Sequence, residues 1–171
     1  MRTQAPGAVA WIRLYVGAIF LSEGVQKFLF PDVLAEGRFA KAGIPFPGIL
    51  APLVGVFEIG CGLLILAGLL TRLAAVPMIV DMVVALGTTK LPILWGQGTL
   101  YVGESGWWDF AHEARTDLAM VCGSVFLFIA GAGRHSLDAA LIALRHDPRA
   151  RRRLSGYPAL TGPARPAGAP A

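Results

Sequence analysis

Four stretches of the chain are almost continuously apolar, and short polar segments separate them. The stretches cover residues 8–30, 49–70, 73–95 and 115–133. A helix needs about 20 apolar residues to cross roughly 30 Å of hydrocarbon, and each stretch is close to that length. Arg13, Glu23 and Lys27 make the first stretch too charged for a signal-peptide core, so it is predicted to be a retained span. The pattern therefore predicts an all-α integral membrane four-helix bundle.

The segments between the stretches predict how the helices connect. Only Thr71 and Arg72 separate the second stretch from the third, which predicts a tight antiparallel hairpin. Residues 87–92 include glycine, threonine, lysine and proline, so the pattern leaves the outer end of the third span undecided. Residues 31–48 mix apolar and charged positions, which indicates a short amphipathic helix on the outer surface that covers the bundle or simply connects two spans.

The composition supports a membrane protein. Of 171 residues, 55% are hydrophobic and 15% are charged, whereas ordinary soluble domains have about 45–50% and about 25%. So much apolar surface excludes a water-soluble globule, and it excludes disorder over most of the chain. Cys61 and Cys122 form no CxxC pattern, so we expect neither a disulfide framework nor a metal site.

Lysine and arginine predict the orientation of the bundle. Ten of these residues lie at the chain ends or in the tight turn, and three lie in the two longer loops. Cytoplasmic segments carry the excess of positive charge in membrane proteins, so both termini are predicted to face the cytoplasm. Arg13, early in the first stretch, is expected to extend its guanidinium to the cytoplasmic interface.

The chain is predicted to have one membrane domain and a tail. Residues 1–145 form the domain, and residues 146–171 form a cytoplasmic tail that is first basic and then rich in proline, glycine and alanine. Such a composition predicts disorder. The basic run from Arg149 to Arg153 suits anionic lipid headgroups, and we expect no nucleic-acid partner.

Every predicted span also carries a carboxylate: Glu23, Glu58, Asp81 and Asp117. An ionisable side chain at the bilayer centre costs about 2.5–3.5 kcal/mol, so these groups are expected to face the bundle interior. At about 1.5 Å of rise per residue, Glu23, Glu58 and Asp117 lie roughly 10, 13 and 3 Å below the outer surface. Asp81 lies roughly 12 Å from the cytoplasmic end of its span, closest to the other leaflet.

The pattern predicts a polar cluster, open to the outer face, of Glu23, Lys27, Glu58, His112 and Asp117. Lys27 follows Glu23 by four residues, so the two side chains share one helix face and form either part of a site or a contact that only fixes packing. Glu58 has no base within a turn of its own helix, so we expect a neutral carboxyl group that donates a hydrogen bond or passes a proton. Glu58, Glu23 and His112 are therefore the candidate catalytic groups.

Lys27, Asp117, Asp81, Trp107 and Trp108 are the candidate binding residues. The two tryptophans lie with other aromatic residues around the third loop. Aromatic rings gather at headgroup depth in membrane proteins, which favours an interfacial belt, and a cage that stacks on a ligand is the alternative.

The second stretch contains Gly55, Gly60, Gly62 and Gly68, which permit close helix contact, with Gly60 and Gly68 on one face. These glycines belong to an ordered set between residues 11 and 138: Arg13, Gly17, Gly24, Lys27, Gly43, Ile44, Pro45, Glu58, Gly60, Gly62, Leu63, Leu64, Gly68, Leu69, Thr71, Arg72, Ala74, Ala75, Gly131, Gly133, Ser136, Leu137 and Asp138. With this set the chain resembles the DoxX family of small bacterial four-helix membrane proteins. The family is similar to the DoxD subunit of thiosulfate:quinone oxidoreductase and to membrane partners of thiol-stress and superoxide-defence enzymes. The resemblance implies a membrane location and a link to quinone or sulfur redox chemistry, and it does not imply catalysis by this chain.

Three functions remain open. The first is a redox-associated subunit in the bacterial inner membrane that binds quinone or a small sulfur compound at the polar cluster. No haem-ligating histidine pair and no nucleotide motif is present, so electrons would pass to a soluble or membrane redox enzyme, and we expect no covalently bound cofactor. The second is a structural or assembly subunit whose charges only fix packing. The third is a small-solute or proton-coupled carrier, for which four helices are few unless the protein forms a homodimer.

Overall fold

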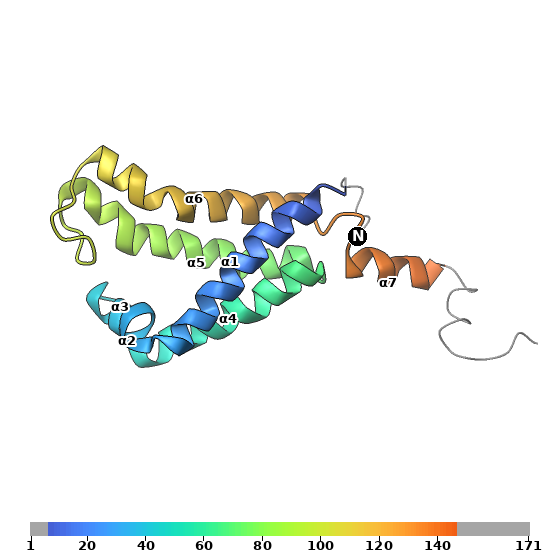
Figure 1. The fold of residues 1–171 in the computed structure, drawn as a ribbon, viewed down its shortest axis with the longest axis horizontal. Coiled ribbons are helices and arrows are strands. Elements are labelled where there is room, and N and C mark those ends of the chain that lie inside the picture. Colours follow the sequence, from blue (N-terminus) through green and yellow to red (C-terminus); the bar gives the residue numbers. More distant parts are fainter. Residues whose placement is uncertain (1–6, 147–171) are drawn as a thin grey trace, which may run out of the picture. The chain divides into compact units, whose positions relative to one another are not determined.

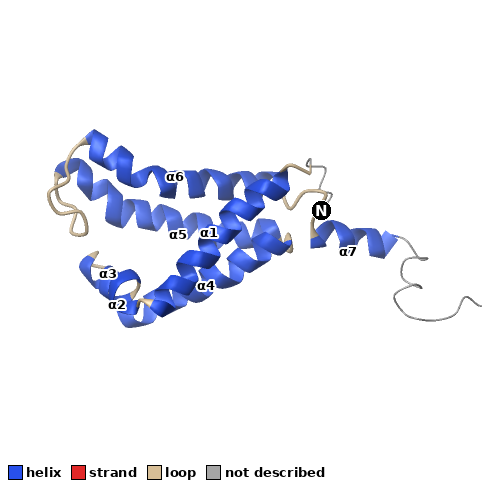
Figure 2. Cartoon of the chain, viewed as in Figure 1, coloured by secondary structure: helices blue, strands red, loops and turns tan. Residues whose placement is uncertain are grey.

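The structure is a computed structural model that describes residues 7–146. Every regular element in that range is helical and no strand occurs in it, which confirms the all-α prediction (Figures 1 and 2). The elements are α1 (Val9–Leu29), α2 (Pro31–Leu34), α3 (Glu36–Lys41), α4 (Pro47–Ala67), α5 (Thr71–Ala85), a π-helical turn (Leu86–Lys90), a 3-10 helix (Leu91–Trp95), α6 (Trp107–Ala130) and α7 (Leu137–His146).

The chain divides into two compact units, Met1–Ala139 and Ala140–Ala171, with the boundary inside α7. The fold and the candidate site described below belong to the first unit. The predictions made for Arg149 to Arg153 and for the end of the tail fall outside the described residues.

The four longest helices of the first unit pack in a closed cycle. Helix α1 contacts α4, α4 contacts α5, α5 contacts α6, and α6 returns to α1 (Figure 1). Apolar side chains fill the centre, and the fully buried ones include Val16, Phe20, Ile65, Met78 and Leu127. The inward positions of each helix thus form one hydrophobic core.

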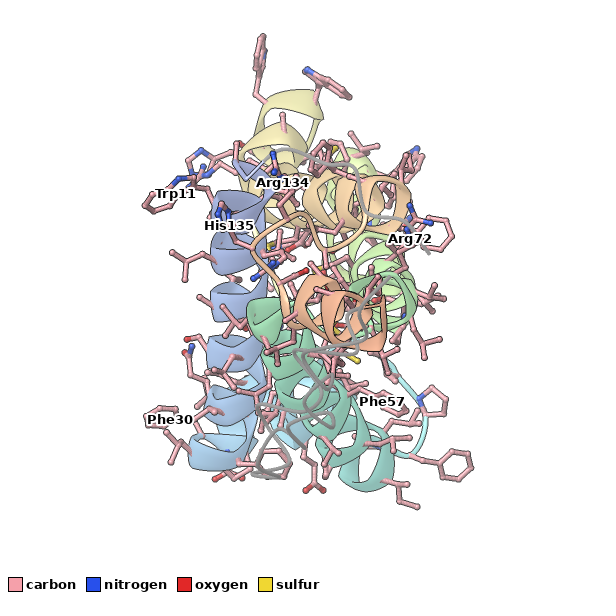
Figure 3. All side chains as sticks on the ribbon, turned by 90° about the vertical axis from the view of Figure 1, so that its right-hand side faces the viewer. Trp11, Phe30, Phe57, Arg72, Arg134 and His135 are labelled. Atoms are coloured by element: carbon pink, nitrogen blue, oxygen red, sulfur yellow. The ribbon has the colours of Figure 1, made fainter. Side chains whose placement is uncertain are left out.

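The outward faces of the same helices are also apolar, which is the reverse of a water-soluble domain. Large hydrophobic side chains stand out from the ribbon on all sides of the view in Figure 3. Exposed examples come from α1, α4, α5 and α6: Trp11, Leu14, Val56, Phe57, Leu73, Val80, Phe128 and Ile129. Contiguous exposed apolar surface of this kind marks contact with lipid or with another protein.

Two helical segments are long and apolar enough to cross a membrane within the part of the chain that the structure describes. They are α4 and the continuous segment Thr71–Trp95, which joins α5 to the π and 3-10 turns. The other two long helices carry more charge, because α1 contains Arg13, Glu23 and Lys27 and the first half of α6 contains several ionisable residues.

Glycine allows α1 and α4 to approach at backbone distance. A β-carbon at Gly62 would lie 2.8 Å from the Leu21 nitrogen and 3.0 Å from the Gly17 oxygen, and one at Gly24 would lie 2.8 Å from the Gly55 oxygen. The predicted role of the glycines in close packing holds for Gly55 and Gly62. It is wrong for Gly60, where an added β-carbon would meet no atom within 4 Å.

The α4–α5 hairpin is as tight as predicted, but it turns one step earlier. Gly68 and Leu70 both adopt left-handed backbone conformations (φ +69° and +49°), and α5 already begins at Thr71. Asp138 holds the turn, because its Oδ1 accepts the Leu70 N–H and its own N–H donates to the Gly68 carbonyl.

Arg13 corrects another expectation. Its side chain is only 7% exposed, so it does not extend to the interface. The guanidinium instead donates to the carbonyls of Ile65 and Leu66 at the end of α4, and to those of Ala132 and His135 after α6. The carboxyl end of a helix leaves carbonyls without partners, and a cation suits them both as a donor and as a charge.

The remaining differences concern element ends. Helix α6 begins at Trp107 rather than near Arg115, so the third loop is shorter than predicted. The first loop contains two short helices, α2 and α3, that meet at Ala35, instead of one amphipathic helix. The third apolar segment ends at Trp95, as the predicted stretch 73–95 does, but it leaves α-helical geometry at Leu86.

Candidate functional site

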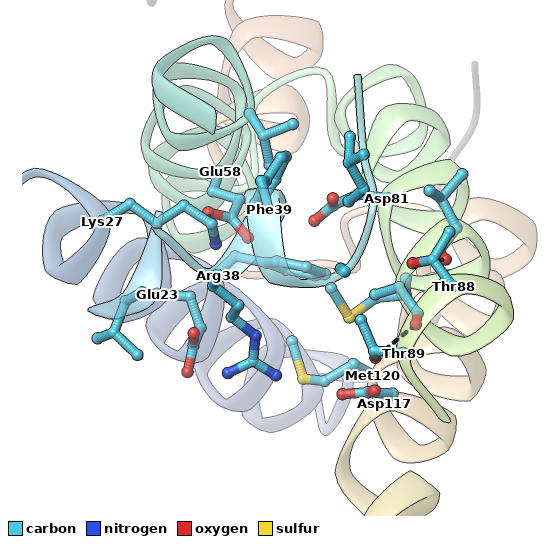
Figure 4. Close-up of a pocket in the computed structure, with 18 of the residues that line it drawn as sticks. Glu23, Lys27, Arg38, Phe39, Glu58, Asp81, Thr88, Thr89, Asp117 and Met120 are labelled. Carbon is cyan, nitrogen blue, oxygen red and sulfur yellow. Dashed lines mark hydrogen bonds and ion pairs between the residues drawn. The ribbon is translucent and has the colours of Figure 1, made fainter. Parts of the chain in front are cut away.

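A cavity of about 310 Å³ lies between α1, α3, α4, α5 and α6. Much of its wall is apolar, with contributions from Ile19, Phe20, Leu34, Phe39, Leu50, Val54, Met82 and Met120. Charged and hydroxyl side chains complete the wall: Glu23, Lys27, Arg38, Glu58, Asp81, Thr88, Thr89, Thr116 and Asp117 (Figure 4). Pockets for small organic ligands combine an apolar wall with a few convergent polar groups in this way.

The structure brings five of the sequence-predicted site residues to this one cavity: Glu23, Lys27, Glu58, Asp81 and Asp117. They come from four different helices, because each long helix turns its charged position away from the outer apolar face. Asp81 was expected to lie closest to the other leaflet and was left out of the predicted polar cluster. The structure places it on the wall of the same cavity as Glu58 and Asp117.

Lys27 forms an ion pair with Glu58 on α4. The Lys27 Nζ lies 2.5 Å from Glu58 Oε2, and the two side chains are 11% and 1% exposed. The residues of its own helix had indicated that Glu58 has no basic partner. The structure shows that the neighbouring helix supplies one. The same contact shows that Lys27 is directed at Glu58 rather than at Glu23.

Asp81 approaches the pair from α5. One of its oxygens, Oδ2, is buried and has no hydrogen-bond partner among the described residues. Two neighbouring carboxylates repel each other unless a proton or another donor lies between them. The Asp81 side chain thus presents an acceptor to the cavity, and Figure 4 shows its carboxylate directed toward Glu58.

Arg38 reaches the cavity from α3, and sequence reasoning did not select it. Its Nη2 donates to the Tyr101 hydroxyl at 3.4 Å, and Figure 4 shows the guanidinium between the Glu23 and Asp117 side chains. The sequence spacing could have indicated Arg38 as a site residue. Arg38, Phe39 and Ala42 share one face at helical spacing, and all three line the cavity.

A second polar group lies next to the cavity, at Lys90. The Lys90 Nζ donates to the Tyr101 hydroxyl, lies 3.5 Å from Glu113 Oε2 and stands 4.0 Å from the centre of the Tyr101 ring. The Tyr101 hydroxyl therefore receives hydrogen bonds from Lys90 and from Arg38, and it connects the third loop to α3.

The π-helical turn gives two threonines their place on the wall. Thr88 and Thr89 both line the cavity, and their hydroxyls donate to the carbonyls of Val84 and Ala85 at 2.8 and 2.7 Å. A π-turn inserts an extra residue into the helical register, and such turns are frequent at functional sites. No motif in the sequence predicts this change of register.

His112, Trp107 and Trp108 lie outside the residues that line the cavity. His112 is exposed, and its Nδ1 lies 2.5 Å from Arg115 Nη1. Trp107 packs at a tilt against Phe110, and Trp108 is 82% exposed. Within residues 7–146, no group of histidine, cysteine and acidic side chains could hold a metal ion, and Cys61 and Cys122 are free thiols.

The fold and the cavity together define a helical membrane protein that encloses charged side chains between its helices. The chain belongs to the DoxX family: the family model, described as DoxX, matches residues 8–91. The chain is also similar to the uncharacterized membrane protein Rv3486 of Mycobacterium tuberculosis, with 52% identity over 141 residues, or 82% of this chain and 85% of the relative. No solved structure matches the chain.

Proposed function

We propose that this DoxX-family protein binds a quinone in the cavity and serves as a redox-associated subunit of the bacterial inner membrane. The observation that carries the proposal is the cavity of about 310 Å³, in which apolar side chains from six helices surround charged hydrogen-bonding groups. A quinone has a flat apolar ring and carbonyl oxygens that need donors, so an apolar wall with a few donors complements it. Ligand pockets commonly have volumes of roughly 300–1,000 Å³, and a single quinone ring suits the lower end of that range.

The proposal includes a membrane topology. Four helices, α1, α4, Thr71–Trp95 and α6, cross the bilayer, and both termini face the cytoplasm. The apolar outer faces of these helices support contact with lipid, and the inward carboxylates follow the rule that intramembrane charges avoid lipid. The excess of arginine at the chain ends supports the orientation.

The charge of the wall favours a quinone over an anionic sulfur compound. Four carboxyl groups (Glu23, Glu58, Asp81 and Asp117) face two cations (Lys27 and Arg38), so the wall has a formal charge of −2 when all of them are ionised. An oxyanion would add to this excess in a region of low dielectric constant, where repulsion is strong. A neutral ligand adds no charge, and its hydroxyl form can exchange protons with the acids.

Proton handling is the role that we propose for the acids. Glu58 and Asp81 lie at the buried side of the cavity, with Lys27 beside them, and Glu23 is exposed at the α1 wall. A proton can thus move between a buried carboxyl group and one that water reaches. Electrons would pass between the bound quinone and a partner redox enzyme, so the chain itself needs no electron-carrying group.

The Glu58→Gln variant tests the proposal. Glutamine keeps the size and the contact with Lys27 but cannot ionise, so we expect a folded protein that binds menadione more weakly. Purified protein in lipid nanodiscs would be titrated with menadione, with its thermal unfolding as the readout, because a ligand that binds only the folded state raises the unfolding temperature. Glu113→Gln is the matched control, since Glu113 also pairs with a lysine but does not line the cavity.

The alternatives predict different results. If menadione does not shift the unfolding of the native protein and Glu58→Gln fails to fold, the protein is a structural or assembly subunit. If liposomes take up a solute with protons and Asp81→Asn abolishes the uptake, the protein is a carrier. A shift that is equally large in the native protein and in both variants would place the quinone elsewhere.

A further inference from the structure

Arg38 occupies an unusual position for a charged side chain in this protein. It belongs to α3, which follows the first long helix and covers the cavity with Phe39 and the adjacent Ala42. The residue is half-buried, and its guanidinium points into the cavity toward Asp117 (Figure 4). A surface connection would have let an arginine extend into water, and this one turns inward.

The guanidinium is almost without hydrogen-bond acceptors. It has five N–H donors, and in the described part of the chain they make one hydrogen bond, the 3.4 Å contact with Tyr101, which is long for such a bond. The ion pairs found among residues 7–146 are Lys27–Glu58 and Lys90–Glu113, and neither includes Arg38.

Arg13 provides an internal comparison. It is equally able to donate, and it makes four hydrogen bonds to backbone carbonyls in a fully protein environment. Arg13 is buried, and it pairs four of its five N–H donors with the protein, as buried polar groups usually do. Arg38 is half-buried, and its remaining donors face the open volume of the cavity.

Most other donors on the cavity wall already have partners. Lys27 is held by its ion pair with Glu58, and the hydroxyls of Thr88 and Thr89 donate to carbonyls of their own helix. Arg38 is thus the cation of this wall that no ion pair holds in the described part of the chain, so its guanidinium is the donor that a neutral ligand with a carbonyl oxygen would use, since hydrogen bonds from an ionised donor are stronger than neutral ones.

We infer that Arg38 binds a carbonyl oxygen of the quinone and that Tyr101 positions it for that contact. The inference rests on the proposed function and adds the residue that recognises the oxidised ring. Tyr101 can position Arg38 because its hydroxyl is itself held by Lys90. Asp81 Oδ2, an unpaired acceptor on the same wall, suits a hydroxyl of the reduced ring instead.

The experiment compares two probes that differ only in their oxygens. Menadione and 2-methylnaphthalene share the ring, and the second has no acceptor. Dissociation constants for both would be measured in nanodiscs with the native protein, Arg38→Gln, Arg38→Lys and Lys41→Gln, after subtraction of partition into lipid. Lys41 is the matched control, because it is an exposed cation at the end of the same short helix and does not line the cavity.

We expect Arg38→Gln to weaken menadione binding by roughly 10- to 100-fold, as for the loss of a charge-assisted hydrogen bond. Binding of the hydrocarbon should change by less than about twofold, Arg38→Lys should recover part of the loss, and Lys41→Gln should bind like the native protein. Tyr101→Phe keeps the guanidinium charge, so its expected loss is smaller and follows the same selectivity for menadione.

A second measurement does not depend on whether Arg38→Gln folds. Infrared spectra of menadione bound to the native protein should show one carbonyl band moved to lower frequency, and Arg38→Lys should move it partly back. Unchanged menadione affinity in folded Arg38→Gln, an equal loss for both probes, or an unshifted carbonyl band would overturn the role of Arg38 and leave the proposed function standing. Absence of any menadione binding by the native protein would instead remove the proposed function, and this inference with it.

Discussion

Lys27 and Glu58 connect α1 to α4 through an ion pair that solvent barely reaches. Withdrawing two charges from water is costly, and their attraction offsets this cost only while both are present. Removal of one partner leaves a buried charge alone, which typically costs about 3–5 kcal/mol, whereas replacement of both by apolar groups is often close to neutral.

We therefore expect Lys27→Met to lower the free energy of unfolding by about 3–5 kcal/mol, because the buried Glu58 carboxyl group loses its partner. The double variant Lys27→Met with Glu58→Leu should recover most of that loss. Unfolding in detergent, followed by circular dichroism, gives the values for a double-mutant cycle. A double variant that is less stable than Lys27→Met would contradict this expectation, because the unpaired Glu58 would then not be the source of the loss.

The same pair shows what sequence alone could give for the site. All four acids of the cavity wall were identifiable, because a carboxylate in an apolar run is unusual. Their partners were not, since spacing along one helix suggested Glu23 for Lys27, and the actual contact crosses to α4. Arg38 was missed for a related reason: whether a loop residue turns inward depends on helices far away in the sequence.

Close packing of α1 on α4 depends on glycine at the points where backbone meets backbone. A β-carbon at Gly62 would approach the Leu21 nitrogen to 2.8 Å, and neither backbone can move without shifting a whole helix. At Gly60, two residues earlier on α4, a β-carbon meets nothing within 4 Å. The two positions therefore form a matched pair in one helix.

We expect Gly62→Ala to destabilise the protein by about 1–3 kcal/mol, the usual cost of overpacking. Gly60→Ala should be neutral or stabilise by up to about 1 kcal/mol, because alanine favours the helix more than glycine does. Thermal unfolding of both variants in the same nanodiscs measures the difference. Equal stabilities would show that the helices separate easily at this point, which would contradict a backbone contact.

The sequence predicted the long helices themselves but not the residues at which they begin and end. The four apolar stretches correspond to α1, α4, the Thr71–Trp95 segment and α6, because 20-residue apolar runs have few other uses. The start of α6 was missed by eight residues, since Trp107 to Ala114 is polar enough to be mistaken for a loop. The π-turn at Leu86–Lys90 was also missed, because glycine and threonine weaken any helix signal without specifying which register replaces it.

At the scale of the molecule, the arrangement is inverted relative to a soluble protein. Apolar side chains cover the outer faces of the long helices, and the charges of five helices meet inside at one cavity. In lipid both features lower the free energy, because hydrocarbon contacts the apolar faces and the charged side chains avoid it. The cavity thus lies where the inward charged positions of a small bundle meet.

The orientation of the molecule in the membrane gives the last prediction. Loop residue Val102 is 88% exposed and follows the Thr71–Trp95 segment, and His135 is exposed after α6. With four spans and the arginine excess at the chain ends, Val102 should face outward and His135 the cytoplasm. The test uses a background with Cys61→Ala and Cys122→Ser and a membrane-impermeant maleimide. In intact spheroplasts the maleimide should label Val102→Cys at once, and it should label His135→Cys only after permeabilisation.

Neither substitution removes an arginine or lysine, so the charge bias that sets orientation is unchanged. The reverse pattern would mean that the bundle is inserted the other way round, and labelling of both sites in intact spheroplasts would mean that α6 does not cross the membrane.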